Sequence, residues 1–474
     1  MVFSSFVFLC IFLPAVFLLY CIIPSLKAKN ALLIAASLVF YAYGEPVYVL
    51  LMIFSSLFNY LCARWVTAQG GKHKKLALVC AVVLNLGILA VFKYSAMMVS
   101  TLNHAFSLHI PVPEIALPIG ISFFTFQALS YVIDVYRGTV EVQKNYFHVL
   151  LYISFFPQLI AGPIVKYRDI HEQIAARKQD KEKIALGFRR FICGLMKKVF
   201  IANTMGQAAD LIFGAGLSDL SAASAWIGAI AYLFQIYYDF SGYSDMAIGL
   251  GQMFGFEFKE NFRYPYGANN IQDFWRRWHI SLSTWFKEYL YIPLGGNRKG
   301  KPRTVLNRLI VFFCTGLWHG ANWTFVLWGL WHGLFLILEE YIPALKKLPK
   351  GLSNLYTMLV VTIGFVVFRA DTITYGFGYI GKMFSAFSPT AAGKALILEP
   401  LTPWFIFMLV IAIAGCAPLK PLADKVRAGA ALAQKSKAQS AVQIALFAGA
   451  VAGLLCCLIH LAPGGYNPFI YFRF

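Results

Sequence analysis

Charged residues are scarce in this chain. Asp, Glu, Lys and Arg make up 13% of its 474 residues, whereas hydrophobic residues make up 59%. A soluble protein of this size could not bury so much apolar surface, and spans of ~20 residues leave room for about ten or more transmembrane helices. The composition excludes an ordinary soluble domain. It predicts an all-α polytopic integral membrane protein surrounded by the lipid bilayer.

Acidic residues are scarcer still, because 21 Asp and Glu stand against 41 Lys and Arg, which gives a net charge of +20. Excess positive charge in a membrane protein usually lies in cytoplasmic loops and at lipid headgroups. The sequence contains no RNA- or DNA-binding motif. We therefore assign the charge to membrane topology and expect no nucleic-acid partner.

Several signatures of common sites are also missing. None of the nine cysteines forms a Cys-x-x-Cys pair, and most lie in apolar runs, so we interpret them as small buried hydrophobic residues. The chain has no metal-ligand spacing, no glycine-rich phosphate loop and no Gly-x-Ser-x-Gly nucleophile motif. The sequence therefore predicts no metal site and no permanently bound cofactor.

Apolar runs recur along the whole chain, without a soluble domain or a long linker between them, and we expect one integral membrane domain over residues 1–474. The positive-inside rule places the N-terminus outside and the basic segments Arg64–Lys75 and Lys166–Lys198 in the cytoplasm. The apolar run Phe147–Val165 would then enter and leave on the same side, which predicts a broken, re-entrant segment.

A second basic loop, Lys420–Lys437, carries five Lys or Arg residues against one acid. If this loop is cytoplasmic, Val442–Leu461 runs outward and leaves Pro463–Phe474 as an extracellular tail. Both chain ends are therefore expected outside.

One pentapeptide, Gly-Leu-Trp-His-Gly, occurs at residues 316–320 and again at 329–333 in an apolar stretch. An ionisable residue at membrane depth is a candidate for function. On one unbroken helix, the imidazoles of His319 and His332 would lie roughly 220° apart around the axis and about 20 Å along it. One histidine would then take part in the chemistry and the other would be structural, unless Gly320–Asn322 break the helix.

The segment Phe274–Trp285 is dense in aromatic rings and guanidinium groups and contains His279. It fits a juxtamembrane amphipathic helix whose tryptophans anchor at the interface. It fits equally well a cationic site for a phosphate-rich donor, in which Arg276 or Arg277 pairs with phosphate. Composition does not choose between these interpretations.

Two carboxylates, Asp239 and Asp245, lie in another apolar run. On a helix they would point about 240° apart, so they cannot act as an acid–base pair, although Gly242 is a candidate helix break. We favour structural Arg or His partners for both. Lys93, in or near an expected outer loop, is expected on a solvated face.

Taken together, these motifs resemble the membrane-bound O-acyltransferase family, and within it the bacterial alginate and peptidoglycan O-acetyltransferase branch. The matching pieces are Met1–Ser5, Leu117–Phe123, Tyr238–Asp245, Phe274–Trp285, Gly295–Arg298 and Gly316–Asn322. The resemblance runs from the first residue to about Glu340, and residues 341–460 match in hydropathy alone. It implies transmembrane, re-entrant and amphipathic helices that form a central funnel, in which a cytoplasmic acyl thioester meets an extracellular acceptor.

The resemblance also implies site residues. The invariant histidine of the family falls on His319 and a second conserved histidine falls on His279, whereas His332 lacks such an assignment and is expected to pack or to support the site residues from behind. Contacts to the donor or substrate are expected from Trp275, Arg276, Arg277, Trp278 and Asn322.

The segment Phe469–Phe474 resembles the Phe-Ile-Tyr-x-x-Phe motif of related export systems. That resemblance implies that Tyr471 carries the acyl group onward to an extracellular SGNH-type partner of esterase fold. The alternative is an amphipathic tail that lies on the membrane.

We therefore hypothesise an acyltransferase of the bacterial cytoplasmic membrane. It would move an acetyl group from acetyl-CoA to Tyr471, with His319 as the base, and from there to a partner that acetylates alginate-like exopolysaccharide or peptidoglycan. The alternative within the family is a teichoic-acid D-alanyl transferase. A polysaccharide transporter or flippase, and a structural scaffold of a secretion complex, are the alternatives from other classes.

Overall fold

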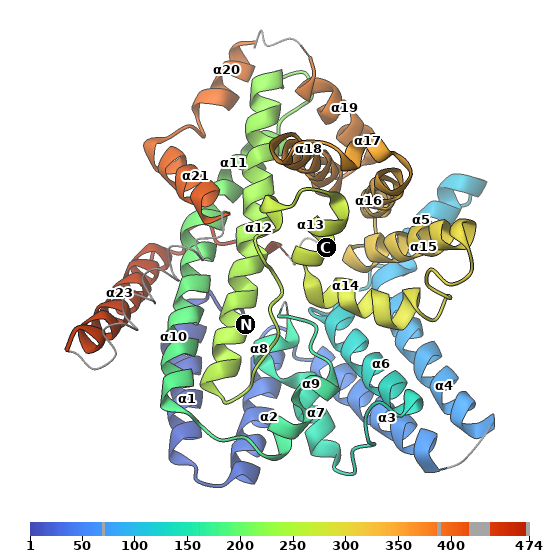
Figure 1. Cartoon of the computed structure of the whole chain (residues 1–474), viewed down its shortest axis with the longest axis vertical. Helices are drawn as coiled ribbons and strands as arrows, with labels where there is room; N and C mark the ends of the chain where they lie inside the picture. The colour runs from blue at the N-terminus through green and yellow to red at the C-terminus, as the bar shows by residue number, and fades with distance from the viewer. Residues whose placement is uncertain (69–71, 161, 386–389, 417–436, 471–474) are drawn as a thin grey trace.

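The computed structural model describes residues 1–68, 72–160, 162–385, 390–416 and 437–470. Within these residues the regular secondary structure is helical, and no strand occurs (Figure 1). The expectation of an all-α protein is confirmed.

Four helices of the described part are long and apolar enough to cross a membrane. They are α3 (Tyr48–Ala68), the continuous run His73–Phe106, α18 (Lys350–Arg369) and the stretch Ile444–Leu461 of α23 (Lys437–Leu461). Two shorter apolar helices cover Phe8–Ile22 and Pro403–Gly415 (α21). The expected ten or more spans are not confirmed, because several apolar runs are divided into shorter helices and other long helices, such as Ala222–Met253, are not apolar enough.

The N-terminal half is a bundle around an aromatic core. Its helices are η1 (Phe8–Phe12), α1 (Leu13–Ile22), α2 (Leu26–Ala42), α3, α4 (Lys72–Leu89), η2 (Ala90–Tyr94), α5 (Ser95–Phe106) and α6 (Ile121–Arg137). Phe8, Phe12, Phe40 and Phe156 form six ring pairs whose centroids lie 5.4–6.2 Å apart. Such edge and offset pairs favour a defined packing beyond simple burial.

The run Phe147–Val165 is broken, as the re-entrant interpretation requires. Helix α7 (Tyr146–Ser154) ends one residue before the short α8 (Phe156–Leu159), and both are followed by α9 (Tyr167–Ala175). Every residue of α8 is buried within the protein, which is where irregular backbone in a membrane protein is tolerated.

Helix α12 (Ala222–Met253) is an uninterrupted α-helix of 32 residues, and α10 (Lys181–Met196) lies beside it (Figure 1). A reciprocal pair of hydrogen bonds between Ser221 and Ser224 caps its start at 3.3 and 3.0 Å. Gly242 does not interrupt the helix. After α10, the chain continues through η3 (Lys197–Ala202) into α11 (Asn203–Phe213).

The two aspartates of α12 have structural partners, as expected. The Asp245 carboxylate pairs with Arg190 at 2.8 Å and with Lys197 at 2.6 Å. Asp239 pairs with Lys198 at 2.8 Å, and both of these side chains are buried. The partners are arginine and lysine, all on α10 and η3, and no histidine takes part.

The C-terminal half surrounds the candidate site. Its elements are η4 (Pro265–Gly267), α13 (Ile271–Arg277), α14 (Ile280–Phe286), η5 (Lys287–Tyr291), α15 (Lys301–His319), α16 (Trp323–Tyr341), α17 (Pro343–Lys346), α18, α19 (Ile373–Met383), α20 (Ala391–Leu398), α21 and α23. Helices α15 and α16 form an antiparallel hairpin that packs against α13 and α18.

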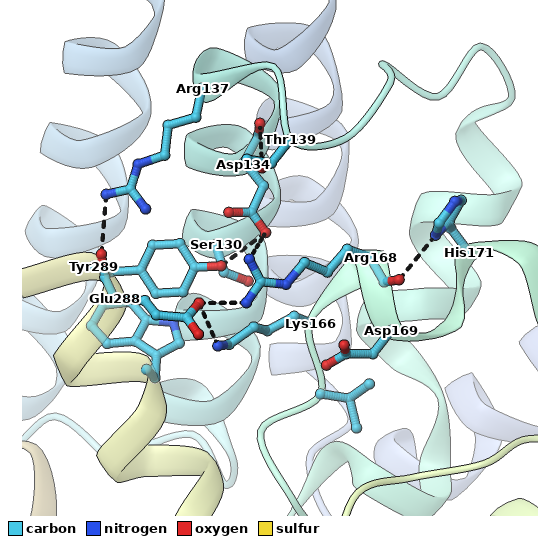
Figure 2. Close-up of polar contacts among 12 residues, drawn as sticks. Ser130, Asp134, Arg137, Thr139, Lys166, Arg168, Asp169, His171, Glu288 and Tyr289 are labelled. Carbon is cyan, nitrogen blue, oxygen red and sulfur yellow. Dashed lines mark hydrogen bonds and ion pairs between the residues drawn. The ribbon is translucent and has the colours of Figure 1, made fainter.

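A charged cluster joins α6 to η5 across the loop before α9 (Figure 2). Glu288 accepts hydrogen bonds from Lys166 at 2.7 Å and from Arg168, and the Tyr289 hydroxyl donates to Asp134 at 2.8 Å. Burial works against the charge of Glu288, yet the hydrogen bonds and charges of Lys166 and Arg168 outweigh it and hold the pKa of this carboxyl below its usual value. The cluster therefore fixes three separate segments to one another.

Candidate functional site

The repeated pentapeptide forms a helical hairpin, so residues 320–322 do break the helix and the geometry expected for one unbroken helix does not apply. Helix α15 ends at His319 and α16 begins at Trp323. Asn322 is the N-cap of α16: its side-chain oxygen accepts a hydrogen bond from the Thr324 amide at 3.1 Å, and its side-chain nitrogen donates to the Asp371 carbonyl at 2.9 Å. The amide that sequence reasoning assigned to the substrate is therefore engaged in capping.

The first glycine of each pentapeptide allows the two helices to approach closely. A Cβ at Gly316 would lie 2.4 Å from the carbonyl oxygen of Phe325, and one at Gly329 would lie 2.2 Å from that of Phe312. Neither distance is compatible with a side chain at these positions. The repeat is thus a packing motif, and both His319 and His332 contact one ring, that of Trp328, at centroid distances of 5.0 and 5.2 Å.

His319 lies at the end of α15 in an aromatic enclosure. Its ring centroid is 5.1 Å from that of Trp318, 5.0 Å from that of Trp328 and 5.3 Å from that of Phe368. Both ring nitrogens are buried and have no hydrogen-bond partner among the described residues. Buried polar atoms are normally paired, so a buried imidazole without partners can engage a reactant.

His279 lies next to His319, with ring centroids 6.4 Å apart. It precedes α14 in the left-handed region, at φ 42°, a backbone conformation that is costly for a residue with a side chain and that occurs most often at functional sites. Its Nδ1 lies 3.3 Å from the Asn261 side-chain oxygen, while its Nε2 is buried without a hydrogen-bond partner in the described structure. The structure therefore brings together the two histidines that the resemblance singled out.

His332 is completely buried and lies between aromatic rings. It stacks on Phe274 with ring centroids 6.0 Å apart and meets Trp275 edge-on at 5.3 Å. Its nitrogens also have no hydrogen-bond partner in the described part of the chain. Unlike His319, which lines two cavities, it contributes to neither of them, so its surroundings are those of a packed side chain.

Lys93 is a member of the site that the sequence interpretation placed wrongly on a solvated face. It is buried, and its ammonium donates to the carbonyl of Trp318 at 2.6 Å, to that of His319 at 3.4 Å and to the Ser122 hydroxyl at 3.2 Å. It therefore satisfies the last carbonyls of α15, where the helix dipole favours a positive charge. A lone lysine inside the apolar run 76–98 was the signal that could have revealed it.

Two cavities reach His319. One has a volume of about 280 Å³ and is lined by Lys93, the segment Leu117–Phe123, Ile160, Trp318 and His319. The other is nearly filled, at about 10 Å³, and its walls include Trp278, Trp328, His319 and Ile470. Trp278, expected to contact the substrate, thus borders the His319 cavity.

The segment that follows α23 enters the protein instead of lying on its surface. Exposure falls steadily from Gly465, which is exposed, through Tyr466 and Pro468, which are half-buried, to Phe469 and Ile470, which are each 6% exposed. Tyr471, the expected acyl carrier, lies outside the described residues. The last described residue, Ile470, shares a cavity with His319.

Arg276 and Arg277 have different surroundings. The guanidinium of Arg277 pairs with Asp273, one helical turn earlier, at 2.9 Å. Arg276 is exposed and lines a groove of about 270 Å³ together with Lys287 and Trp275. Other walls of this groove are Phe286, Tyr291, Arg308, Phe312 and Thr315. Positive charges at an apolar groove suit a ligand with anionic and apolar parts.

The arrangement combines a buried base with approaches of different chemistry. Neutral imidazole at His319 or His279 can take a proton from a hydroxyl and return it to a leaving group. Arg276 and Lys287 add positive charge to one apolar groove and Lys93 adds it to the larger cavity beside His319, whereas the Ile470 cavity is almost entirely apolar. No cluster of three or more metal-ligating side chains occurs among the described residues.

Comparisons with known proteins agree with this chemistry. The family model described as MBOAT, membrane-bound O-acyltransferase family, matches residues 141–370. The chain is 40% identical to a probable alginate O-acetylase AlgI of Azotobacter vinelandii over 100% of both chains, and 43% identical to that of Pseudomonas aeruginosa over 81% of this chain and 75% of the relative. It is 39% identical to a peptidoglycan O-acetyltransferase of Helicobacter pylori over 79% of this chain and 78% of the relative.

Proposed function

Because the chain belongs to the membrane-bound O-acyltransferase family, and is therefore an acyltransferase, we propose that it moves an acetyl group from acetyl-CoA to Tyr471. The acetyl group then passes to an extracellular SGNH-type partner, which acetylates a cell-surface polysaccharide. The protein acts in the bacterial cytoplasmic membrane, with both chain ends outside, and its helices form a funnel around His319.

One observation carries this proposal: Ile470 lines the same cavity as His319. Tyr471 is the next residue in the chain, and consecutive Cα atoms are about 3.8 Å apart. The backbone that leads to the tyrosine is thus held beside the candidate base. An amphipathic tail lying on the membrane would not bury Phe469 and Ile470 inside the protein.

The transfer needs a base, because a phenol with a pKa near 10 is a weak nucleophile at neutral pH. His319 takes the phenolic proton as the Tyr471 oxygen attacks the thioester carbonyl. The C–S bond breaks as the new C–O bond forms, and the CoA thiolate leaves with the proton from His319. General base catalysis of this kind typically contributes 10²–10⁴-fold.

The sequence of transfers runs downhill. A thioester is more activated than an aryl ester, and an aryl ester is more activated than a sugar ester. The acetyl group can therefore pass from CoA to tyrosine and from tyrosine, through the partner, to the polymer without further energy input. No bound cofactor or metal has a role in these steps.

The groove lined by Arg276 and Lys287 is the proposed donor site. The pantetheine arm of CoA is narrow, whereas its phosphates are anionic, which suits the apolar walls and the positive rim. Thr315, one helical turn before His319, also lines this groove. The groove thus approaches the hairpin that carries the base.

The names of the relatives favour an alginate-like exopolysaccharide as the final acceptor. Peptidoglycan is the second candidate, favoured by the H. pylori relative. Acetyl measurements on both polymers from the same cells distinguish the two.

The decisive experiment follows label from acetyl-CoA. Purified protein is incubated with isotopically labelled acetyl-CoA, and the C-terminal peptide is analysed by mass spectrometry. We expect one acetyl group on Tyr471, absent in Tyr471→Phe, which keeps the ring but removes the nucleophilic oxygen.

The same variant is then tested in cells. Wild-type acetylation of the polymer in Tyr471→Phe cells would contradict the carrier role and leave the tail as a docking element. A requirement for a carrier-protein thioester, with no turnover of acetyl-CoA, would favour D-alanyl transfer instead.

A further inference from the structure

The Lys198–Asp239 ion pair differs from the other ion pairs of α12 because it also binds the tail, residues 464–470. Both side chains are 2% exposed, and their charged atoms lie 2.8 Å apart. The Lys198 ammonium donates a hydrogen bond to the carbonyl of Pro468. The Asp239 carboxylate accepts one from the amide of Ile470 at 3.0 Å. Each charge therefore has one bond to the pair and one to the tail backbone.

Helix packing does not account for this pair. A second pair, Lys197–Asp245, already joins the same two helical segments and forms no hydrogen bond or ion pair with residues 464–470. A buried ion pair is on balance a poor source of stability, since an apolar pair of similar volume often stabilises a fold as well or better. The feature that distinguishes Lys198 and Asp239 is their contact with Pro468 and Ile470.

The two bonds define a register. They engage the carbonyl of Pro468 and the amide of Ile470, and a slip by one residue would present different backbone groups to both charges. Proline has no amide hydrogen, so the tail leaves no unpaired donor at residue 468. The bonds involve only the backbone, so the pair sets the position of the segment and not the identity of its side chains.

Neighbouring contacts hold the segment on the same path. Asn467 donates to the carbonyl and the hydroxyl of Ser4, both at 3.2 Å, and its oxygen accepts from Asn203 at 3.2 Å. The Phe469 ring lies 4.5 Å from that of Tyr243. Upstream, Gly464 and Gly465 are exposed, so the segment can detach without disturbing the helices.

We propose that Lys198 and Asp239 are positioning residues that dock the tail backbone in one register and so deliver the residue after Ile470 to the His319 cavity. This inference rests on the proposed function of Tyr471. Detachment of the tail from the pair would then release the loaded segment toward the partner.

The test compares two matched double variants of the full-length protein. Lys198→Met/Asp239→Leu replaces the docking pair without leaving a lone buried charge, and Lys197→Met/Asp245→Leu does the same to the neighbouring pair. Docking is measured as the rate of chymotrypsin cleavage after Phe469, delivery as the initial rate of acetyl labelling on Tyr471, and donor affinity as the Kd of acetyl-CoA.

We expect the docking variant to be cleaved at least roughly 10-fold faster and labelled about 100-fold more slowly, the scale of loss for a small misplacement of a reacting group. Its Kd for acetyl-CoA should match the wild type. The control variant should keep wild-type cleavage and labelling rates. Equal behaviour of the two variants would overturn the proposal, because the pair would then act only on helix packing.

The outcomes also separate this inference from the proposed function. If chymotrypsin cleaves the docking variant as slowly as the wild type and Tyr471 is labelled, the docking role of the ion pair is overturned and the carrier role of Tyr471 is retained. If that variant is cleaved faster but Tyr471 of the wild-type protein carries no acetyl label, the docking role of the ion pair is retained and the carrier role of Tyr471 is overturned.

Discussion

Polar side chains are paired in the cluster around Glu288, whereas the imidazole enclosed at His319 is unpaired. Glu288 is bonded to Lys166 and Arg168, and these contacts join three segments of the fold (Figure 2). The imidazole of His319 is enclosed by aromatic rings, and its nitrogens have no hydrogen-bond partner among the described residues. Burial of an unpaired polar group costs free energy. The contrast teaches that the polar groups of the cluster hold separate segments together, whereas the His319 nitrogens are unpaired beside two cavities, where a reactant can meet them.

The largest expected effect is the loss of chemistry at His319. His319→Ala should lower acetyl transfer by about 10²–10⁴-fold, since it removes the general base. The midpoint of thermal unfolding should fall as well, because a buried ring is truncated, so turnover is expressed per folded molecule. Turnover of acetyl-CoA and thermal unfolding, measured on the same preparation, check both parts. A variant that unfolds but retains activity per folded molecule would reverse the assignment.

His332 provides the matched comparison, since it belongs to the second copy of the pentapeptide. His332→Ala should destabilise the protein by about 3 kcal/mol, as truncation of other buried rings does, and should lower yield more than turnover per folded molecule. His332→Phe keeps the ring that stacks on Phe274 and should restore much of the stability. Loss of turnover in a stable His332→Phe protein would give this histidine a chemical role.

Glu288→Gln should weaken the paired cluster by about 1–3 kcal/mol at neutral pH, because hydrogen bonds to a charged group are lost. The pKa of Glu288 is depressed in the folded state. Its contribution to stability is therefore complete above the unfolded-state pKa of roughly 4.3, and it is lost as the pH falls through the folded-state pKa. The gap in unfolding midpoint between wild type and variant should therefore close below that pH. If the difference in unfolding midpoint did not depend on pH, the charge of Glu288 would not be the source of the lost stability.

The smallest effect is expected at the donor groove. Arg276→Glu should raise KM for acetyl-CoA several-fold, roughly 10-fold at low salt, and the difference should shrink as salt screens the charges. Arg277→Glu disturbs a partly exposed pair with Asp273 and should change KM much less. Steady-state kinetics at two salt concentrations compare the two variants. Equal KM values for both would place the phosphates elsewhere.

Sequence reasoning predicted the helical class, left a break at residues 320–322 open and singled out His319 and His279 as candidates, because each depends on local patterns. Hydropathy indicates helices, glycine and asparagine mark a helix end, and the motif context marks His319 and His279. It could not distinguish Arg276 from Arg277, since only the three-dimensional structure shows that Asp273 pairs with one of them.

Other parts of the site depend on contacts between distant segments. Two of the three partners of Lys93, Trp318 and His319, lie more than 200 residues away along the chain, and no spacing rule predicts them. The number of membrane spans could not be predicted from the sequence pattern either. Apolar runs such as 305–338 give hydropathy but not the turn that divides them into α15 and α16.

The contact between Ser4 and Asn467 has a consequence for the order of folding. These residues are 463 positions apart, and the entropy of closing a loop grows with its length. The contact becomes favourable only when the intervening helices have already brought the two segments together. Tail docking is therefore a late step in the maturation of the chain. On the proposed mechanism, an incompletely folded protein has no docked acceptor segment and leaves acetyl-CoA unconsumed.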